Sequence, residues 1–250
     1  MKGRHLSFRS GNPALTKNTF SNAVPDSSGQ VMTLDGTVNK TSISLLILFG
    51  TAFYTFSTQN TSYIWLGFIG GFILALATIF KKHWSPYTVP LYAALEGLAL
   101  GGISLVFETM YPGIAQQAIL LTFGIFGALL FAYKTRIIQA TENFKLGIFA
   151  ATAGIGLTYL ISFIMRIFFG GGLSIMSIEN ASMMSIGFSL FVVVIAALNL
   201  VLDFDFIEQG AEVGAPKYME WYGAFGLLVT LIWLYLEILR LLAKLQSRRN

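Results

Sequence analysis

The chain has 250 residues, of which 55% are hydrophobic and only 11% are charged. Soluble domains carry about 25% charged residues, so this composition, with a mean hydropathy of +0.68, excludes an ordinary soluble domain and indicates one membrane-embedded bundle. The basic residues behind the net charge of +4 lie between apolar runs, which favours loops facing an anionic membrane surface over a nucleic-acid partner. Cysteine is absent, which excludes disulfides and thiolate metal sites.

Residues 1–40 are polar, contain scattered Gly, Asn, Pro and Ser, and lack the apolar core of a secretory signal. We expect them to form an irregular cytoplasmic tail. We expect residues 41–245 to form a transmembrane bundle and residues 246–250 a short basic C-terminal tail.

A helix needs about 20 mostly apolar residues to cross about 30 Å of hydrocarbon. Runs of this kind recur along the chain, separated by polar or turn-forming segments, and each is predicted to be a transmembrane helix. The predicted fold is therefore an all-α integral membrane protein with seven spans. The runs are 41–58, 62–80, 88–108, 114–134, 145–169, 181–202 and 219–243.

The orientation follows from the basic residues of the short loops. The N-terminal tail carries five basic residues. The loop after the second span carries Lys81 and Lys82, and the loop after the fourth span carries three basic residues within 134–145. The opposite loops contain only Arg166. The N-terminus is therefore predicted to be cytoplasmic. Seven crossings then place the C-terminus outside, although the basic residues within 240–249 favour the inside, and the sequence leaves this open.

Small residues recur at four-residue spacing on two predicted spans. Ala93, Gly97 and Gly101 form one such stripe, where another helix backbone could approach closely. We interpret both stripes as helix-packing surfaces, with a pore lining as the alternative. The second stripe consists of Ala150, Gly154, Thr158 and Ser162.

Few ionisable residues lie at membrane depth, where a charge costs several kcal/mol and needs a partner or water. Glu96 lies inside the third span and Glu237 inside the last. For Glu96 the alternatives are a structural hydrogen bond and a role in an ion path. For Glu237 they are a gating role and a local ion pair with Arg240 three residues later.

The sixth span ends in acidic residues, of which Asp203 and Asp205 point about 200° apart on a helix. Asn199 precedes Asp203 by four residues and shares its face. We therefore expect Asp203 to point into the bundle and Asp205 to face headgroups or a loop. Asp205 and Glu208 are interpreted first as a solvated helix end.

Two acidic segments resemble the Bax inhibitor-1-like family, the YccA-type or transmembrane Bax-inhibitor-motif proteins. LVLDFDFIEQG, residues 200–210, is similar to the ending of that family's sixth helix, and LIWLYLEILRLL, residues 231–242, is similar to its last helix. RSGNPAL and VNKTS near the start resemble a bacterial branch. The resemblance covers about residues 41–245 and implies six helices around a central last one, in the bacterial inner membrane.

The resemblance also implies an activity, because members are described as pH-sensitive calcium-leak channels with an acidic sensor pair and an arginine latch. By position the pair is Asp203 and Glu237, with glutamate in place of the usual aspartate. The latch position falls near Lys81, where lysine cannot fork to two carboxylates as arginine does, and Arg240 is a second candidate. The acid that some members carry in the second helix has no counterpart in GFIGGFIL, residues 67–74.

Two carboxylates held close in low dielectric cannot both ionise cheaply. We therefore hypothesise that the pair shares a proton at lower pH and holds the last two helices together, and that repulsion separates them as the pH rises. The same two carboxylates, Asp203 and Glu237, offer the hard oxygen ligands that suit transient calcium binding. We expect no cofactor, with calcium as the permeant ion.

Other functions remain open. Catalysis is not expected, because both histidines, His5 and His83, lie outside the apolar runs, and an aspartyl protease would need a second membrane aspartate. A proton-coupled transporter could use Glu96, although no internal repeat is evident. A third alternative is an interaction protein, because YccA-type members are associated with a membrane-bound protease, which the tail would then contact. The expected partners are thus the lipid bilayer and such a protease.

Overall fold

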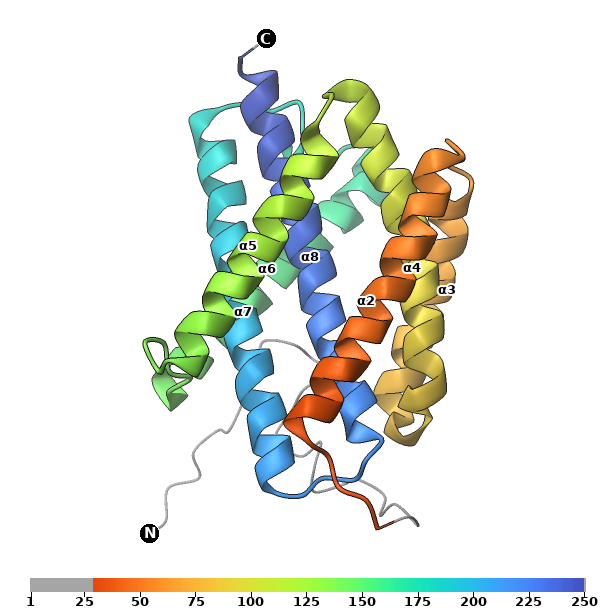
Figure 1. The fold of residues 1–250 in the computed structure, drawn as a ribbon. Coiled ribbons are helices and arrows are strands. Elements are labelled where there is room, and N and C mark those ends of the chain that lie inside the picture. Colours follow the sequence, from red (N-terminus) through yellow and green to blue (C-terminus); the bar gives the residue numbers. More distant parts are fainter. Residues whose placement is uncertain (1–28, 250) are drawn as a thin grey trace.

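The computed structural model describes residues 29–249, and within them seven long α-helices run roughly along one axis (Figure 1). Two short 3-10 helices, η1 (Lys82–Trp84) and η2 (Ser174–Met176), lie in the connections. The seven predicted spans are confirmed as helices. They are α2 (Leu34–Ser57), α3 (Tyr63–Phe80), α4 (Ser85–Met110), α5 (Ile114–Lys134), α6 (Glu142–Phe169), α7 (Met183–Glu212) and α8 (Met219–Ser247).

The bundle has two ends, which we name by the chain. The amino end is where α2 begins, and it also holds the connections 81–84, 135–141 and 213–218. The carboxyl end is where α8 ends, and it holds the connections 58–62, 111–113 and 170–182. The α2, α4, α6 and α8 helices run from the amino end to the carboxyl end, and α3, α5 and α7 run back (Figure 1).

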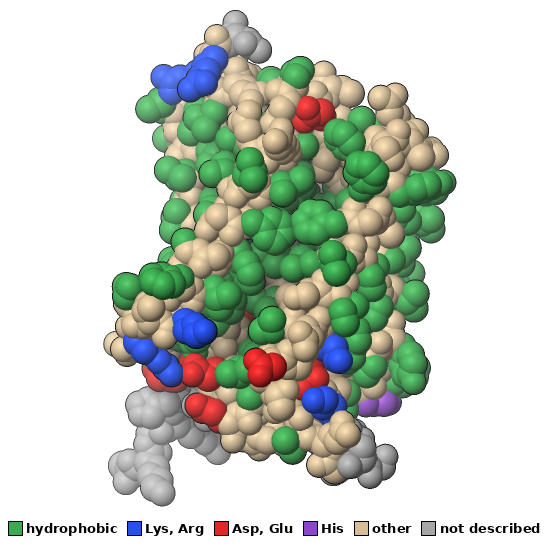
Figure 2. Space-filling view, in the orientation of Figure 1, with side chains coloured by type: hydrophobic (Ala, Val, Ile, Leu, Met, Phe, Trp, Pro, Cys, Tyr) green, Lys and Arg blue, Asp and Glu red, His purple; other side chains and the backbone are tan. Residues whose placement is uncertain are grey.

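Length and hydropathy fit a membrane protein. Six segments of the described chain, α3, η1 with α4, α5, α6, α7 and α8, are long and apolar enough to cross a membrane. The remaining helix, α2, is 24 residues long, or about 36 Å at 1.5 Å per residue, but it carries more polar residues. Large side chains such as Phe53 and Phe80 are 73% and 80% exposed, and Figure 2 shows hydrophobic side chains across the middle of one face, with charges toward the ends.

The last helix lies at the centre, as predicted. Most of α8 is buried, and it packs most extensively on α7 and also on α2, α4 and α5. The α6 helix packs on α7, and α3 packs mainly on α4. The α8 side chains are therefore shielded from lipid over most of their length, which makes this helix the axis along which a buried site can form.

The first helix begins at Leu34, seven residues before the predicted start, so residues 34–40 are helical rather than part of an irregular tail. Thr33 is the reason, because its hydroxyl accepts a hydrogen bond from the Gly36 backbone amide at 3.0 Å and caps the helix. Similarly, α8 extends to Ser247, into the predicted C-terminal tail. Residues 1–28 of the predicted tail lie outside the described residues.

Of the two predicted small-residue stripes, only the first is a helix-packing surface. A Cβ on Gly97 would overlap the Leu48 carbonyl of α2, and one on Gly101 would overlap the Ala52 carbonyl, so this stripe is a close helix-packing surface as predicted. For the second stripe the packing interpretation is wrong. No atom lies within 4 Å of a Cβ built on Gly154, because α6 uses Ile148 and Ile155 to pack on α7 instead.

Candidate functional site

Asp203 and Asn199 lie on the buried face of α7. Asp203 is fully buried and Asn199 is 1% exposed, which confirms that this face points inward. The Asn199 amide nitrogen donates to the Thr152 hydroxyl of α6 at 2.9 Å and to the Ile195 carbonyl of its own helix at 2.8 Å. Asn199 therefore links α6 to α7 one turn from Asp203, and a carboxyl group is placed inside the bundle.

The structure does not bring Asp203 and Glu237 together. Because α7 and α8 are antiparallel, the contacts of Ile207 with the Gly223 position and of Lys244 with Ser185 fix which residues are level. Asp203 lies four residues before Ile207 on α7. On the antiparallel α8 it is therefore level with the residue four positions after Gly223, which is residue 227. Glu237 lies ten residues further along, or about 15 Å at 1.5 Å per residue. The predicted shared-proton pair is therefore not formed.

The register between α7 and α8 explains why the predicted pairing fails, and α7 is also longer than expected. We placed the end of this span near residue 202, but α7 continues to Glu212. Asp203 thus lies well inside the helix, about 13.5 Å from its last residue at 1.5 Å per residue. The two acids lie on different levels of the same helix pair, and each has its own surroundings.

Glu237 is held by two partners at the level where it lies. It is 2% exposed, and both of its carboxylate oxygens accept hydrogen bonds from the Arg240 guanidinium at 2.9 Å. The Tyr159 hydroxyl of α6 donates to the same carboxylate and also accepts from Arg240, at 2.7 Å. This confirms the Glu237–Arg240 pair and shows that it also ties α8 to α6.

Tyr159 is a site residue that the sequence did not reveal. It lies 78 residues before Glu237, among other apolar and aromatic residues of α6, so no local spacing connects the two. The only available signal was a tyrosine within a span, because a buried phenol usually finds a hydrogen-bond partner. We refer to Tyr159, Glu237 and Arg240 as the carboxyl-half lock.

Asp205 and Glu208 do not form a solvated helix end, which corrects that interpretation. Asp205 lies 2.7 Å from the ammonium of Lys145 at the start of α6, and this lysine side chain is only 4% exposed. Glu208 accepts hydrogen bonds from the Tyr133 hydroxyl and, at 2.8 Å, from Arg136. These pairs join α5, α6 and α7 at the amino end, so they hold the helices around Asp203 in place.

Glu96 lies at nearly the same level as Asp203. The parallel helices α4 and α8 meet through the Tyr92 and Phe225 rings, whose centroids are 5.1 Å apart. Four residues beyond Tyr92, Glu96 is level with residue 229 of α8, within two residues of the Asp203 level. Its carboxyl group faces Gly71 of α3, where an added Cβ would come within 2.5 Å of Oε1. Two carboxyl groups thus share one depth of the bundle.

Lys81 is not placed as a latch. It caps the end of α3, and its ammonium lies 4.1 Å from the centroid of the Trp84 ring. No ion pair joins it to Asp203 or Glu237 in the part of the chain that the structure describes. The short loop after α3 holds Lys81 against its own tryptophan, so Arg240 is the latch candidate that contacts an acid.

A shared calcium site at Asp203 and Glu237 does not fit the geometry. Ca²⁺ binds oxygen ligands at 2.3–2.6 Å, whereas these two residues are about 15 Å apart in level. Among residues 29–249, no group of three or more His, Cys, Asp and Glu side chains is arranged to hold a metal. Each acid can therefore meet a passing cation only singly.

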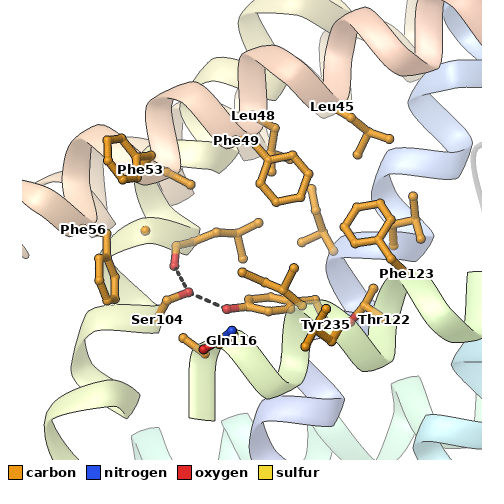
Figure 3. A pocket seen from close by; sticks show the side chains of 18 of the residues that line it. Leu45, Leu48, Phe49, Phe53, Phe56, Ser104, Gln116, Thr122, Phe123 and Tyr235 are labelled. Carbon is orange, nitrogen blue, oxygen red and sulfur yellow. Dashed lines mark hydrogen bonds between the residues drawn. The ribbon is translucent and has the colours of Figure 1, made fainter. Parts of the chain in front are cut away.

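A cavity of about 620 Å³ lies beside α8, between α2, α4 and α5. Figure 3 shows Leu48, Phe49 and Phe53 of α2 on one side and Tyr235 of α8 on the other. The Ser104 hydroxyl shares a 2.6 Å hydrogen bond with the Tyr235 hydroxyl at its edge. The walls are otherwise mostly apolar, so they suit an acyl chain or apolar ligand and do not replace the hydration shell of an ion.

The comparisons with known proteins agree with this architecture. A family model described as Bax inhibitor 1 like matches residues 12–247, nearly the whole chain. No curated protein and no solved structure matched the chain. The match covers all seven helices and includes Asp203 and Glu237.

Proposed function

Because the chain belongs to the Bax inhibitor 1 like family, we propose that it is a pH-dependent cation leak channel whose path follows α8, with calcium as the permeant ion. The observation that supports this most directly is the burial of the Asp203 and Glu237 carboxyl groups on the helix pair α7 and α8. Asp203 is fully buried and Glu237 is 2% exposed. Ionisable groups at membrane depth commonly belong to ion or proton pathways.

Asp203 is the pH-sensing group in this proposal. An ionised carboxylate is costly to bury at membrane depth, and in this proposal Asp203 is the neutral acid in the closed bundle. As the pH rises and the proton leaves, water and cations become favourable neighbours of Asp203. Glu96, at nearly the same level, adds a second acid to this depth. The leak is therefore expected to increase with pH.

The carboxyl-half lock keeps the other half of the path closed. Arg240 neutralises Glu237, and Tyr159 connects both to α6. A cation reaching this level meets a guanidinium before it reaches the carboxylate oxygens. Opening therefore requires Arg240 to leave Glu237, which frees an acidic group for the cation.

The proposed placement is the bacterial inner membrane with the amino end in the cytoplasm. The described amino end carries more basic residues than the carboxyl end, as the positive-inside rule requires of a cytoplasmic face. Within the described residues they are Lys40, Lys81, Lys82, Lys134, Arg136, Lys145 and Lys217.

The first experiment is calcium flux into proteoliposomes at about pH 6, 7 and 8, a range that brackets neutrality. The wild type is compared with Asp203→Asn and with Ser42→Ala, a substitution on the exposed face of α2. We expect a leak that rises with pH in the wild type and in the control and no longer depends on pH in Asp203→Asn. Flux equal to that of empty liposomes at every pH rules the channel out.

A second candidate function is that of an interaction protein that modulates a membrane-bound protease. One observation favours it: residues 30–33 are attached to the connection between α7 and α8. The Met32 amide donates to the Ala215 carbonyl at 2.6 Å, and the Lys217 amide donates to the Gln30 carbonyl at 3.1 Å. A partner that binds the preceding tail would therefore act directly on the two helices that carry Asp203 and Glu237. Co-purification with and without residues 1–28 tests this.

A further inference from the structure

Lys244 is a fully buried lysine near the carboxyl end of α8. No carboxylate of the described residues lies within ion-pair distance of its ammonium. Its position is also beside the first turns of α7, where the helix macrodipole is positive and disfavours a cation. A buried charge in such a place needs strong compensation from another source.

Neutral oxygens provide that compensation. The Lys244 ammonium donates to the Ile175 carbonyl at 2.8 Å, to the Ser189 hydroxyl at 2.9 Å and to the Ser185 carbonyl at 3.4 Å. The Ser185 hydroxyl donates to the same Ile175 carbonyl at 2.9 Å, which fixes the η2 connection on α7. Carbonyl and hydroxyl oxygens without a carboxylate are the ligands by which channels replace the hydration shell of a monovalent cation.

The stripe that carries Lys244 also carries Glu237. Seven residues on a helix turn through nearly two full revolutions, so Lys244 lies on the same side of α8 as Glu237, about 10.5 Å nearer the carboxyl end. Arg240 lies between the two levels. The oxygen cluster is therefore the next polar level beyond the carboxyl-half lock.

We propose that Ile175, Ser185 and Ser189 form a binding site for a monovalent cation the size of ammonium or potassium, and that the Lys244 ammonium occupies this site as a tethered blocker. The blocking role rests on the proposed function, whereas the binding site does not. Lysine suits the role because its ammonium is a compact charge with three donors on a flexible stem. Removing the side chain while keeping the three oxygens vacates the site.

The test of the binding site is thermal unfolding of the purified full-length protein in detergent. Lys244→Ala removes three methylenes and the ammonium, which n-propylammonium replaces. We expect its Tm to rise in ammonium or potassium chloride relative to choline chloride at equal ionic strength, and to rise further with n-propylammonium. Wild type and Arg249→Ala, which lacks an exposed charge at the same end, should show no such rise. Equal effects of n-propanol and n-propylammonium, or no cation-specific shift, would overturn the site.

The blocking role is tested by thallium flux in proteoliposomes with Lys244→Met, which removes the ammonium but still fills the space of the lysine side chain up to its Cε. We expect a several-fold higher leak than in the wild type and in Arg249→Ala, and an unchanged leak overturns the blocker even where Lys244→Ala fails to fold. Cation-specific stabilisation without flux in any variant leaves the site standing and refutes the proposed channel. Flux in the wild type without cation-specific stabilisation refutes the site and leaves the channel standing.

Discussion

Asp203 of α7 and Glu237 of α8 lie on facing helices but about 15 Å apart in level, because α7 and α8 are antiparallel and Ile207 is level with Gly223. They are both buried, yet only Glu237 belongs to the lock with Arg240 and Tyr159. In the proposed channel the two acids therefore act at successive levels rather than by sharing one proton.

The separation predicts additive effects of the two acids. Asp203→Asn is expected to remove the pH dependence of the calcium leak, and Glu237→Gln to raise the leak at every pH because the neutral amide holds Arg240 less strongly. Residues more than about 7–10 Å apart with no shared partner usually combine within about 0.5 kcal/mol. Leak rates of the double variant should therefore equal the product of the single effects, within about twofold. A proton-sharing pair would instead make the second substitution nearly silent.

The lock predicts a role for Tyr159 that a tyrosine on the lipid face does not have. Tyr159→Phe removes one hydrogen bond to Glu237 and one from Arg240, each worth about 1 kcal/mol. We expect the leak to rise about 30-fold, the equivalent of about 2 kcal/mol, without loss of its pH dependence. Tyr87→Phe, at a side chain that is 77% exposed, is the matched control. A leak unchanged by Tyr159→Phe would show that the lock does not limit conduction.

The sequence predicted the spans well, because twenty-residue apolar runs have few structures available to them in a bilayer. Helical periodicity also placed Asn199 and Asp203 on a buried face, and the three-residue spacing gave the Glu237–Arg240 pair as one of two alternatives. These are local relationships, set by the 100° step of a helix. They do not depend on how the helices are arranged.

The errors arise from long-range relationships. The polar residues after Leu202 suggested a helix end, but Lys145 and Arg136 compensate Asp205 and Glu208 and the helix continues. That extension depends on charges 60 and 72 residues away in the sequence. Tyr159 was missed for the same reason, since its partner is on another helix.

The close contact between α2 and α4 predicts that adding a single methyl group at Gly97 lowers the stability of the protein. Gly97→Ala places a Cβ against the Leu48 carbonyl and the Thr51 hydroxyl, and overpacking of this kind costs about 1–3 kcal/mol. Gly127→Ala is the control, because an added Cβ there has no atom within 4 Å and alanine favours a helix by about 1 kcal/mol. We expect Tm to fall for Gly97→Ala and to stay level or rise for Gly127→Ala. Equal Tm values for the two variants would contradict the close packing.

The contact between Glu220, at the start of α8, and Thr33 predicts that Glu220 stabilises the beginning of α2. Its fully buried carboxylate accepts hydrogen bonds from the Thr33 amide at 3.0 Å and the Thr33 hydroxyl at 2.8 Å, and it pairs with Lys217 at 2.8 Å. Glu220→Ala leaves the Thr33 amide without this acceptor, which costs about 1–3 kcal/mol. We expect amide exchange at residues 32–37 to accelerate about 10-fold or more, because each 1.4 kcal/mol is a factor of ten.

Glu212→Ala is the control for this experiment, because Glu212 is an exposed acid at the end of α7. Its exchange rates at residues 32–37 should match those of the wild type. Unchanged exchange in Glu220→Ala would mean that Met32 and its partner Ala215 hold the segment without the carboxylate. Faster exchange that extends along α7 and α8 as well would show that Glu220 couples the entry of the chain to the helices carrying Asp203 and Glu237.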